Sequence, residues 1–300
     1  MDEVISTDVL VIGGGLGTLA AIEAGRHRQR VVLVDKGILG RSGSTPTSGG
    51  YPHVLLPPDL GGDPRDSEAT FVDDVIRGGS YLGNPAVAER VAREGVSRFI
   101  ELHELGVPFE KTPEGKFVVR KSLGETYPKG CPVRGTAGAL MGVLRREVYH
   151  RGVTVIENVM VTRLFCREGR IAGAFGLCRR TGRRYLFKAK AIILAAGSAT
   201  GLYLSYSASF LTTGDGYALA YDVGVPLQHL EFQEFTVIPV PRGRPIATSW
   251  SATTPSVWSS RPAPSWCRPW PGRCGKAGAP SWTRPRASRP TSSRRSSAWA

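Results

Sequence analysis

Three consecutive glycines and a later acidic residue are the features of this sequence best suited to chemistry. Gly13, Gly14 and Gly15 directly follow the apolar run 8–12, and Asp35 ends a second apolar run, 31–34, at a spacing of 35 − 13 = 22 residues from Gly13. Glycines let a backbone approach a pyrophosphate, a helix N-terminus offers unpaired N–H groups, and a carboxylate accepts hydrogen bonds from ribose hydroxyls. The order strand, glycine turn, helix, strand and acid therefore predicts dinucleotide binding rather than a structural turn alone.

The glycine turn departs from the usual G-x-G-x-x-G spacing at its last position. The third glycine is expected at 18, where the chain has Thr18, with Gly17 just before it. That glycine normally permits close packing of helix on strand. We expect Thr18 either to push the helix slightly outward or to lay its small side chain along the turn. The predicted turn comprises Gly13, Gly14, Gly15, Leu16, Gly17 and Thr18.

The elements that must position this turn follow from apolar runs and helix signals. The runs 8–12, 31–34, 153–164 and 189–197 predict strands, the last ending in small residues. Helices are predicted over 16–24, 66–79, 84–106, a stretch ending at 150, and 217–224, with Asn84 as the N-cap of the third. Such alternation of strands and helices predicts an α/β fold.

Net charge is distributed very unevenly along the chain. The total is 39 − 25 = +14 over 300 residues, a value typical of nucleic-acid-binding proteins. Residues 1–234 contain all 25 acidic residues and 28 basic ones, which leaves 28 − 25 = +3, and the remaining 66 residues carry 39 − 28 = +11. The charge thus belongs to the tail, and nucleic acid is not predicted as a partner.

The composition of residues 249–300 differs from that of the rest of the chain. All six tryptophans lie there, without any Asp, Glu, Leu or Ile. Almost every residue in the tail has G or C at the second codon position, as a GC-rich gene gives when it is read in a shifted frame. We therefore expect a frameshift near Ser249, with a disordered Pro/Arg/Ser tail or an RNA-binding tail as alternatives.

The segment after Asp35 resembles a known family of flavoproteins. Residues 36–50 read KGILGRSGSTPTSGG, and 213–216 read TGDG before a helix. Together with the glycine turn, these motifs resemble the succinate dehydrogenase/fumarate reductase flavoproteins, which include L-aspartate oxidase. Residues 124–129 and 134–138 resemble further family segments. The resemblance spans about residues 5–248 and implies a Rossmann-like FAD-binding domain with a parallel central sheet, inserted helices and β-hairpins.

The resemblance also implies which residues hold the cofactor. Small hydroxyl residues and glycines of the loop would donate to pyrophosphate and flavin, Val161 would reach adenine through its backbone, and Asp215 would lie at a helix entry beside FAD, with an N-cap as its alternative role. The full set adds to the turn the residues Asp35, Lys36, Ser42, Ser44, Thr45, Gly49, Gly50, Val161, Ala196, Gly197 and Asp215. Gly43 stands where members with covalent flavin have a histidine, so we expect noncovalent FAD.

The expected activity is hydride transfer between the flavin and a small carboxylate or enone. Two features weaken this expectation: Thr236 replaces the family's substrate-binding histidine, and residues 249–300 match neither the capping domain nor the C-terminal flavin-binding segment. No catalytic residue is assigned. A nonfunctional truncated flavoprotein, an NAD(P)-binding oxidoreductase and a nucleic-acid-binding protein remain as alternatives, and an iron–sulfur or other electron-transfer subunit is an expected kind of partner.

Cellular location and metal binding are predicted from the N-terminal residues and from the spacing of the cysteines. The start Met1-Asp2-Glu3 has no basic or apolar leader, so we expect a cytoplasmic protein without a transmembrane segment. Cys131, Cys166 and Cys178 are scattered and are expected to be buried free thiols, with no metal site. Seven arginines between 163 and 184 are expected to be solvated rather than to form a docking face.

Overall fold

In a computed structural model of the chain, the described residues are 1–204, 206 and 208–232. They all fall within a single unit of the chain, Met1–Pro255. The predicted boundary at 248/249 and the tail 249–300, which was expected to be disordered, lie outside the described residues.

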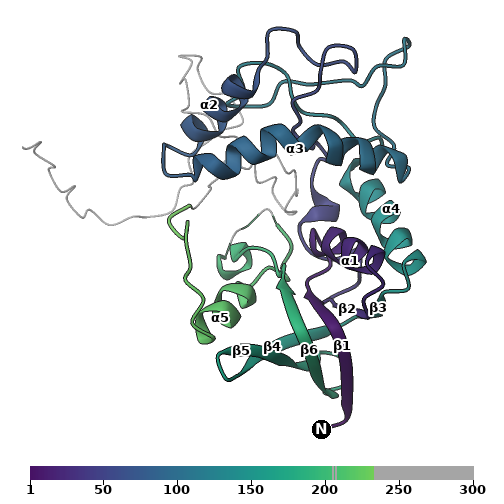
Figure 1. Cartoon of the computed structure of the whole chain (residues 1–300), viewed down its shortest axis with the longest axis vertical. Coiled ribbons are helices and arrows are strands. Elements are labelled where there is room, and N and C mark those ends of the chain that lie inside the picture. The colour runs from purple at the N-terminus through teal and green to yellow at the C-terminus, as the bar shows by residue number, and fades with distance from the viewer. Residues whose placement is uncertain (205, 207, 233–300) are drawn as a thin grey trace, which may run out of the picture. The chain divides into compact units, whose positions relative to one another are not determined.

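A six-stranded sheet in the order β3-β2-β1-β6-β5-β4 forms the centre of the fold (Figure 1). The strands are β1 (Glu3–Ile12), β2 (Val31–Val34), β3 (Thr154–Ile156), β4 (Val159–Arg167), β5 (Arg170–Cys178) and β6 (Arg184–Leu194). β1 pairs in parallel with β2 and β6, and β2 with β3, whereas β5 is antiparallel to β4 and β6. The predicted α/β fold with a parallel central sheet is confirmed.

β2 and the last three residues of β1 are buried on both faces, which explains why Val31–Val34 and Leu10–Ile12 are apolar throughout. Leu10 and Ile12 of β1 pack with β4, β5 and β6 residues in one core cluster. Val11, between them, points to the opposite face and packs with residues of the first and fourth helices. Alternate residues of a strand face opposite ways, so a strand covered on both sides needs apolar residues at every position. Burying each such side chain contributes about 1.5–3 kcal/mol.

Among the described residues there are five α-helices. They are α1 (Gly17–Arg26), α2 (Glu68–Gly78), α3 (Pro85–Glu104), α4 (Thr136–His150) and α5 (Asp215–Asp222), with 3-10 turns η1 (Thr45–Thr47) and η2 (Thr200–Leu202). α1 and α5 contact the sheet while α2 and α3 lie apart from it, and α1 packs on α4, and α2 on α3 (Figure 1). Asn84 is the N-cap of α3, as predicted, and its side chain accepts a hydrogen bond from the Ala86 N–H at 3.0 Å. This bond satisfies a backbone donor that the helix itself cannot pair.

The predicted single strand 153–164 is wrong, because the chain turns within it. β3 ends at Ile156 and β4 begins at Val159, with Asn158 between them at a left-handed φ of 60°. Asparagine tolerates this conformation better than most residues. The turn redirects the chain from the parallel strands into the antiparallel β4–β5 hairpin, so the two halves of the apolar run belong to different parts of the sheet.

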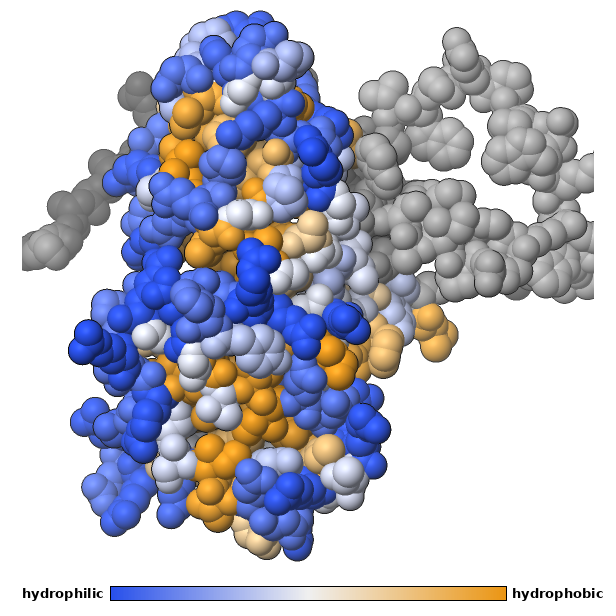
Figure 2. All heavy atoms as spheres, turned by 90° about the vertical axis from the view of Figure 1, so that its right-hand side faces the viewer, coloured by the Kyte–Doolittle hydropathy of each residue, from blue (hydrophilic) through white to orange (hydrophobic). Residues whose placement is uncertain are grey.

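Hydrophilic residues are spread over the face shown in Figure 2, with apolar areas between them. The seven arginines singled out in the sequence are all exposed, as expected: Arg163, Arg167, Arg170, Arg179, Arg180, Arg183 and Arg184. Ion pairs that such exposed arginines form with carboxylates contribute little to stability.

A third core cluster lies beneath α3, where the Phe99 and Phe109 rings are 4.2 Å apart.

Candidate functional site

The glycine turn lies at the ends of β1 and β6. Gly13 has a φ of 110°, and a Cβ on it would lie 2.2 Å from the Ala195 carbonyl oxygen. The Gly13 N–H donates to Val34 O at 2.9 Å, and the Ala195 N–H donates to Ile12 O at 2.8 Å. Only glycine fits at this position, because a side chain would meet both backbone strain and a neighbouring strand end.

Several backbone donors at the start of α1 have no partner within the part of the chain that the structure describes. Among the described residues, no hydrogen bond is made by the N–H groups of Gly14, Gly15, Leu16 and Gly17. Leu16 occupies the N-cap position and makes no side-chain cap, and the first turn of α1 contains no acid. Unpaired N–H groups and the positive end of the helix dipole suit an anion such as a pyrophosphate.

Gly17 performs the packing role that the motif assigns to the glycine one position later. A Cβ on Gly17 would lie 3.1 Å from Val11 Cγ1 and 3.2 Å from Ala195 Cβ, so the helix approaches the sheet at this residue. Thr18 is fully buried, and its hydroxyl donates to Gly15 O at 2.7 Å. Of the two expectations for Thr18, the structure therefore shows the side chain lying along the turn.

Asp35 lies beside this turn with one carboxylate oxygen occupied and the other directed at Gly14. Its Oδ1 accepts from the Gly37 N–H at 2.6 Å and from the Ser42 hydroxyl at 2.9 Å. Its Oδ2 would lie 2.0 Å from a Cβ on Gly14. The carboxylate is thus oriented by its own loop and keeps one oxygen at the turn, which fits the acceptance of ribose hydroxyls next to a bound pyrophosphate.

Hydroxyl groups of the loop from Ser42 to Gly50 bond to its own backbone: Thr47 Oγ1 donates to Ser44 O and Ser48 Oγ to Thr45 O, both at 2.9 Å. Thr45 Oγ1 would lie 3.1 Å from a Cβ on Gly15, which places this residue at the glycine turn. Ser44 Oγ accepts from the Ser209 N–H at 3.5 Å. Gly50 has a φ of 72°, and its missing side chain leaves room for the backbone N of Ala137 in α4, 2.5 Å from where a Cβ would be. No described contact links Gly49 or Gly50 directly to the glycine turn.

An ion pair joins the end of β2 to the start of α5. Lys36 Nζ donates to Asp215 Oδ2 and, at 2.7 Å, to Thr213 Oγ1, and the Thr213 hydroxyl donates to Asp215 Oδ1 at 2.8 Å. The Lys36 and Asp215 side chains are 17% and 19% exposed. Gly214 is the N-cap of α5, and its cap makes no side-chain hydrogen bond, so the alternative role of Asp215 as an N-cap is wrong.

The turn after β6 lies beside both the glycine turn and α5. A Cβ on Gly216 would lie 3.1 Å from Ala196 Cβ, and Gly197 has a φ of 81°. Val161 is 4% exposed, and its side chain packs in the core cluster beneath the sheet. Its strand reaches the site two residues earlier, where the Val159 N–H donates to Asp35 O at 3.0 Å.

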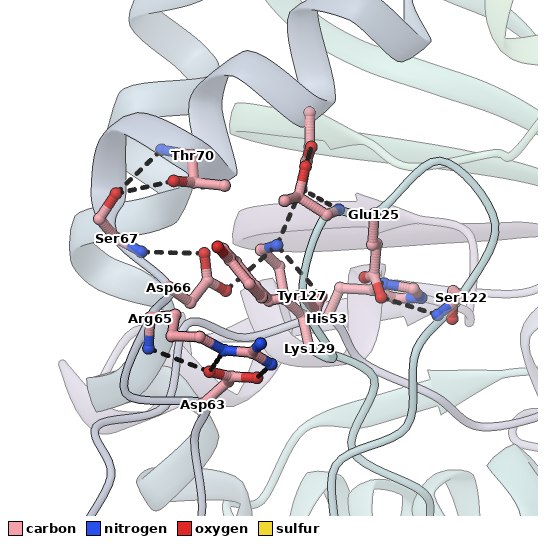
Figure 3. A network of polar contacts seen from close by, with 12 residues as sticks. His53, Asp63, Arg65, Asp66, Ser67, Thr70, Ser122, Glu125, Tyr127 and Lys129 are labelled. Atoms are coloured by element: carbon pink, nitrogen blue, oxygen red, sulfur yellow. Dashed lines mark hydrogen bonds and ion pairs between the residues drawn. The ribbon is translucent and has the colours of Figure 1, made fainter.

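Two groups of polar contacts were not predicted from the sequence. Thr213 completes the Lys36–Asp215 contact, and its place in the TGDG motif was a signal that could have identified it. The second group is a buried ionic network around Lys129 (Figure 3). Asp66 and Asp74 lie far from Lys129 in the sequence, so no local pattern predicts that they pair with it.

The cysteine prediction is right for one residue and wrong for another. Cys131 is 1% exposed, and burial raises the pKa of its thiol to about 12. Cys166 is exposed and Cys178 is half-buried. Strict alternation along β4 would place Cys166 on the same face as the buried Leu164, but a register shift between Phe165 and Cys166 breaks the alternation.

Comparison with known proteins identifies relatives of this arrangement. A family model described as an FAD binding domain matches residues 8–246. One subunit of the fumarate reductase (CoM/CoB) of Methanothermobacter marburgensis is 32% identical over 236 residues, covering 78% of this chain and 42% of the relative. The mitochondrial succinate dehydrogenase flavoprotein subunit of Oryza sativa subsp. japonica is 30% identical over 241 residues, covering 77% and 38%. This chain thus spans about 40% of the length of these relatives.

A solved structure agrees with these matches. The Mycobacterium smegmatis Sdh1 complex in the apo form aligns with a TM-score of 0.68 at 33% identity, over 74% of this chain and 39% of that one. Within the described part of the chain, no helix is long and apolar enough to cross a membrane.

Proposed function

We propose, from the premise that this chain belongs to the FAD binding domain family of the succinate dehydrogenase/fumarate reductase flavoproteins, that it serves hydride transfer between FAD and a small carboxylate or enone. The observation that carries the proposal is the set of unpaired N–H groups at residues 14–17 beside Asp35 Oδ2. The substrate class is supported by the relatives, which are named for fumarate and succinate.

Each segment of the site has a part in holding the dinucleotide. The N–H groups at the start of α1 would bind the pyrophosphate, and Asp35 would accept hydrogen bonds from a ribose. The loop 42–50 would donate from its hydroxyl and backbone N–H groups to the pyrophosphate and flavin. When bound, the flavin supplies a hydride donor or acceptor, while protein groups orient the substrate. The Lys36–Asp215 pair would fix the end of β2 and the start of α5 around it.

Attachment of the flavin and the electron-transfer partner belong to the same proposal. Gly43 carries no side chain that could be linked to flavin, which supports noncovalent binding. The two relatives are named as subunits, which supports an iron–sulfur or other electron-transfer partner for a flavoprotein of this kind. The position of the missing family histidine, Thr236, lies outside the described residues.

Ligand titration of the purified 300-residue chain tests the proposal. The fluorescence of FAD should decrease when the protein binds it, and excess NAD⁺ or NADP⁺ should not displace the bound FAD. Anaerobically reduced flavin on the protein should then be reoxidised by fumarate or by a simple enone. Binding of a nicotinamide nucleotide in place of FAD would overturn the proposal, and bound FAD that no unsaturated carboxylate or enone reoxidises would remove the hydride-transfer part.

A further inference from the structure

A buried ionic network ties the segment 122–133 to Asp74 in α2 and to Asp66 just before that helix (Figure 3). Lys129 Nζ donates to Asp74 Oδ2 at 2.9 Å, to Asp66 Oδ2 at 3.1 Å and to Tyr127 O at 3.3 Å. The three ionic side chains are 3%, 6% and 3% exposed for Lys129, Asp74 and Asp66. All three ammonium hydrogens therefore have protein acceptors, and the network has no free donor for a ligand.

The charges of this network are held in place by their partners. Burial by itself would lower the pKa of Lys129, but its hydrogen bonds to Asp74 and Asp66 raise that pKa above the ordinary value. Burial would raise the pKa of Asp74, but bonds from Thr126 and Lys129 lower it. Transferring charged groups from water into the protein interior costs free energy, and proteins in which apolar residues replace a buried ion pair are often as stable as the original. Stability alone is thus a weak explanation for the network, whereas its fixed geometry orients the chain that it holds.

Backbone hydrogen bonds continue from this network to the end of the candidate cofactor loop. The Val54 N–H donates to Lys129 O at 3.0 Å, the Cys131 N–H to Pro52 O at 2.9 Å, and the Val133 N–H to Gly50 O at 2.9 Å. Residues 129–133 and 50–54 therefore lie side by side. A shift of Lys129 would be transmitted to Gly50, whose other side is packed against the Ala137 backbone without space for a side chain.

Other contacts hold the same segment at its beginning. Asp74 also accepts from the Thr126 N–H at 2.8 Å and from its hydroxyl at 2.6 Å. Glu125 accepts from the Ser122 N–H at 2.8 Å and contacts His53 Nδ1 at 2.5 Å. The 122–129 stretch is thus attached to α2 through Thr126 and Lys129 and to the 50–54 run through Glu125 and Lys129.

We propose that Lys129, acting through Asp66 and Asp74, is a positioning residue that sets the conformation of the cofactor loop ending at Gly50. The inference rests on the proposed function, since it assumes that this loop contacts FAD. Lys129 itself is not placed in contact with the cofactor. A purely structural role would hold α2 to the segment 122–133 without affecting the loop.

Amide hydrogen exchange and FAD titration of the 300-residue protein separate these roles. Lys129→Met leaves two buried carboxylates unpaired, whereas Lys129→Met combined with Asp66→Asn and Asp74→Asn removes all three charges and keeps similar volumes. Arg93→Met is the matched control, because it breaks exposed ion pairs with Glu68 of α2 and Glu89 of α3. Far-ultraviolet circular dichroism of the FAD-free proteins identifies the variants that still fold.

In the folded neutral triple variant without FAD, we expect the amides of Val54, Cys131 and Val133 to exchange at least about tenfold faster than in the unmodified protein. The dissociation constant for FAD should rise about tenfold, and the visible circular dichroism of bound flavin should change. Arg93→Met should alter none of these. Lys129→Arg, which keeps the positive charge, should retain part of the FAD affinity that the triple variant loses.

Unchanged exchange at those amides in a folded variant would overturn the inference, and so would an FAD dissociation constant within about twofold of the original. Failure of the unmodified chain to bind FAD would overturn the proposed function. The exchange measurement needs no cofactor, so it would still decide whether Lys129 orders the loop.

Discussion

The Asp35 carboxylate occupies the space that a side chain on Gly14 would need. Its Oδ2 would lie 2.0 Å from a Cβ on Gly14, although the two residues belong to different strand ends. The glycine turn and the acid after β2 are therefore one packing unit, in which the absence of a side chain at one residue permits the approach of the other.

Gly14→Ala should displace Asp35 and weaken FAD binding by at least about tenfold, or about 1.4 kcal/mol. The added methyl would also lie 2.8 Å from Leu39 Cδ1, so the loop after β2 cannot absorb it without moving. FAD titration measures the effect. Gly142→Ala is the control, since a Cβ there meets nothing within 4 Å, and it should leave the affinity unchanged. Equal affinities of both variants would contradict the relationship.

Lys36→Met should destabilise the fold by about 2 kcal/mol, because it leaves a largely buried carboxylate at Asp215 without its cation. Adding Asp215→Asn should recover part of the loss, since no charge then remains unpaired. Urea unfolding of the two single variants and the double variant gives the coupling free energy. Additive effects would show that the pair does not act as a unit.

Flavin should leave the protein on acid precipitation and appear in the supernatant, because Gly43 offers no side chain for linkage. Gly43→His should still fold, since a Cβ there meets nothing within 4 Å, but the φ of 80° should cost about 1–2 kcal/mol. Absorbance of the two fractions tests the first statement and thermal unfolding the second. Flavin retained in the precipitate of the unmodified protein would contradict noncovalent attachment.

Cys131 should resist thiol reagents at neutral pH until the protein unfolds, because burial raises its thiol pKa to about 12 and keeps it protonated. Cys166, which is exposed, should react in the folded protein. Mass spectrometry after alkylation locates the label, in a Cys267→Ser/Cys274→Ser background that removes the two tail cysteines. Rapid labelling of Cys131 in folded protein would show that the segment 129–133 opens.

Acid should weaken the fold through Asp74. Its folded pKa lies below the ordinary 3.8, so its contribution is present above pH 3.8 and is lost as the pH falls through the lower folded value. Urea unfolding across this range should show a smaller pH dependence in Asp74→Asn than in the unmodified protein. The same slope in both proteins would mean that Asp74 does not contribute to it.

Local sequence patterns are enough to predict much of the site. The apolar runs, the glycine turn and Asp35 are close in sequence, and each constrains its own neighbours through backbone geometry and burial. The order of these elements is therefore sufficient for the α/β fold and for dinucleotide binding, whereas FAD rather than a nicotinamide nucleotide followed from the resemblance of residues 36–50 and 213–216 to flavoproteins. The break at Asn158 is missed because an apolar run reads the same whether its strand continues in one sheet position or turns into another.

Which segments form strands, helices and a dinucleotide-binding turn follows from the sequence alone, because these elements depend on the periodicity and conformational limits of adjacent residues. Three relationships instead required the folded chain: Gly17 takes the packing role, Asp215 pairs with Lys36 rather than capping α5, and Lys129 joins Asp66 and Asp74. These are contacts between distant segments, and a charged or small residue carries no local signal of the partner that folding brings to it.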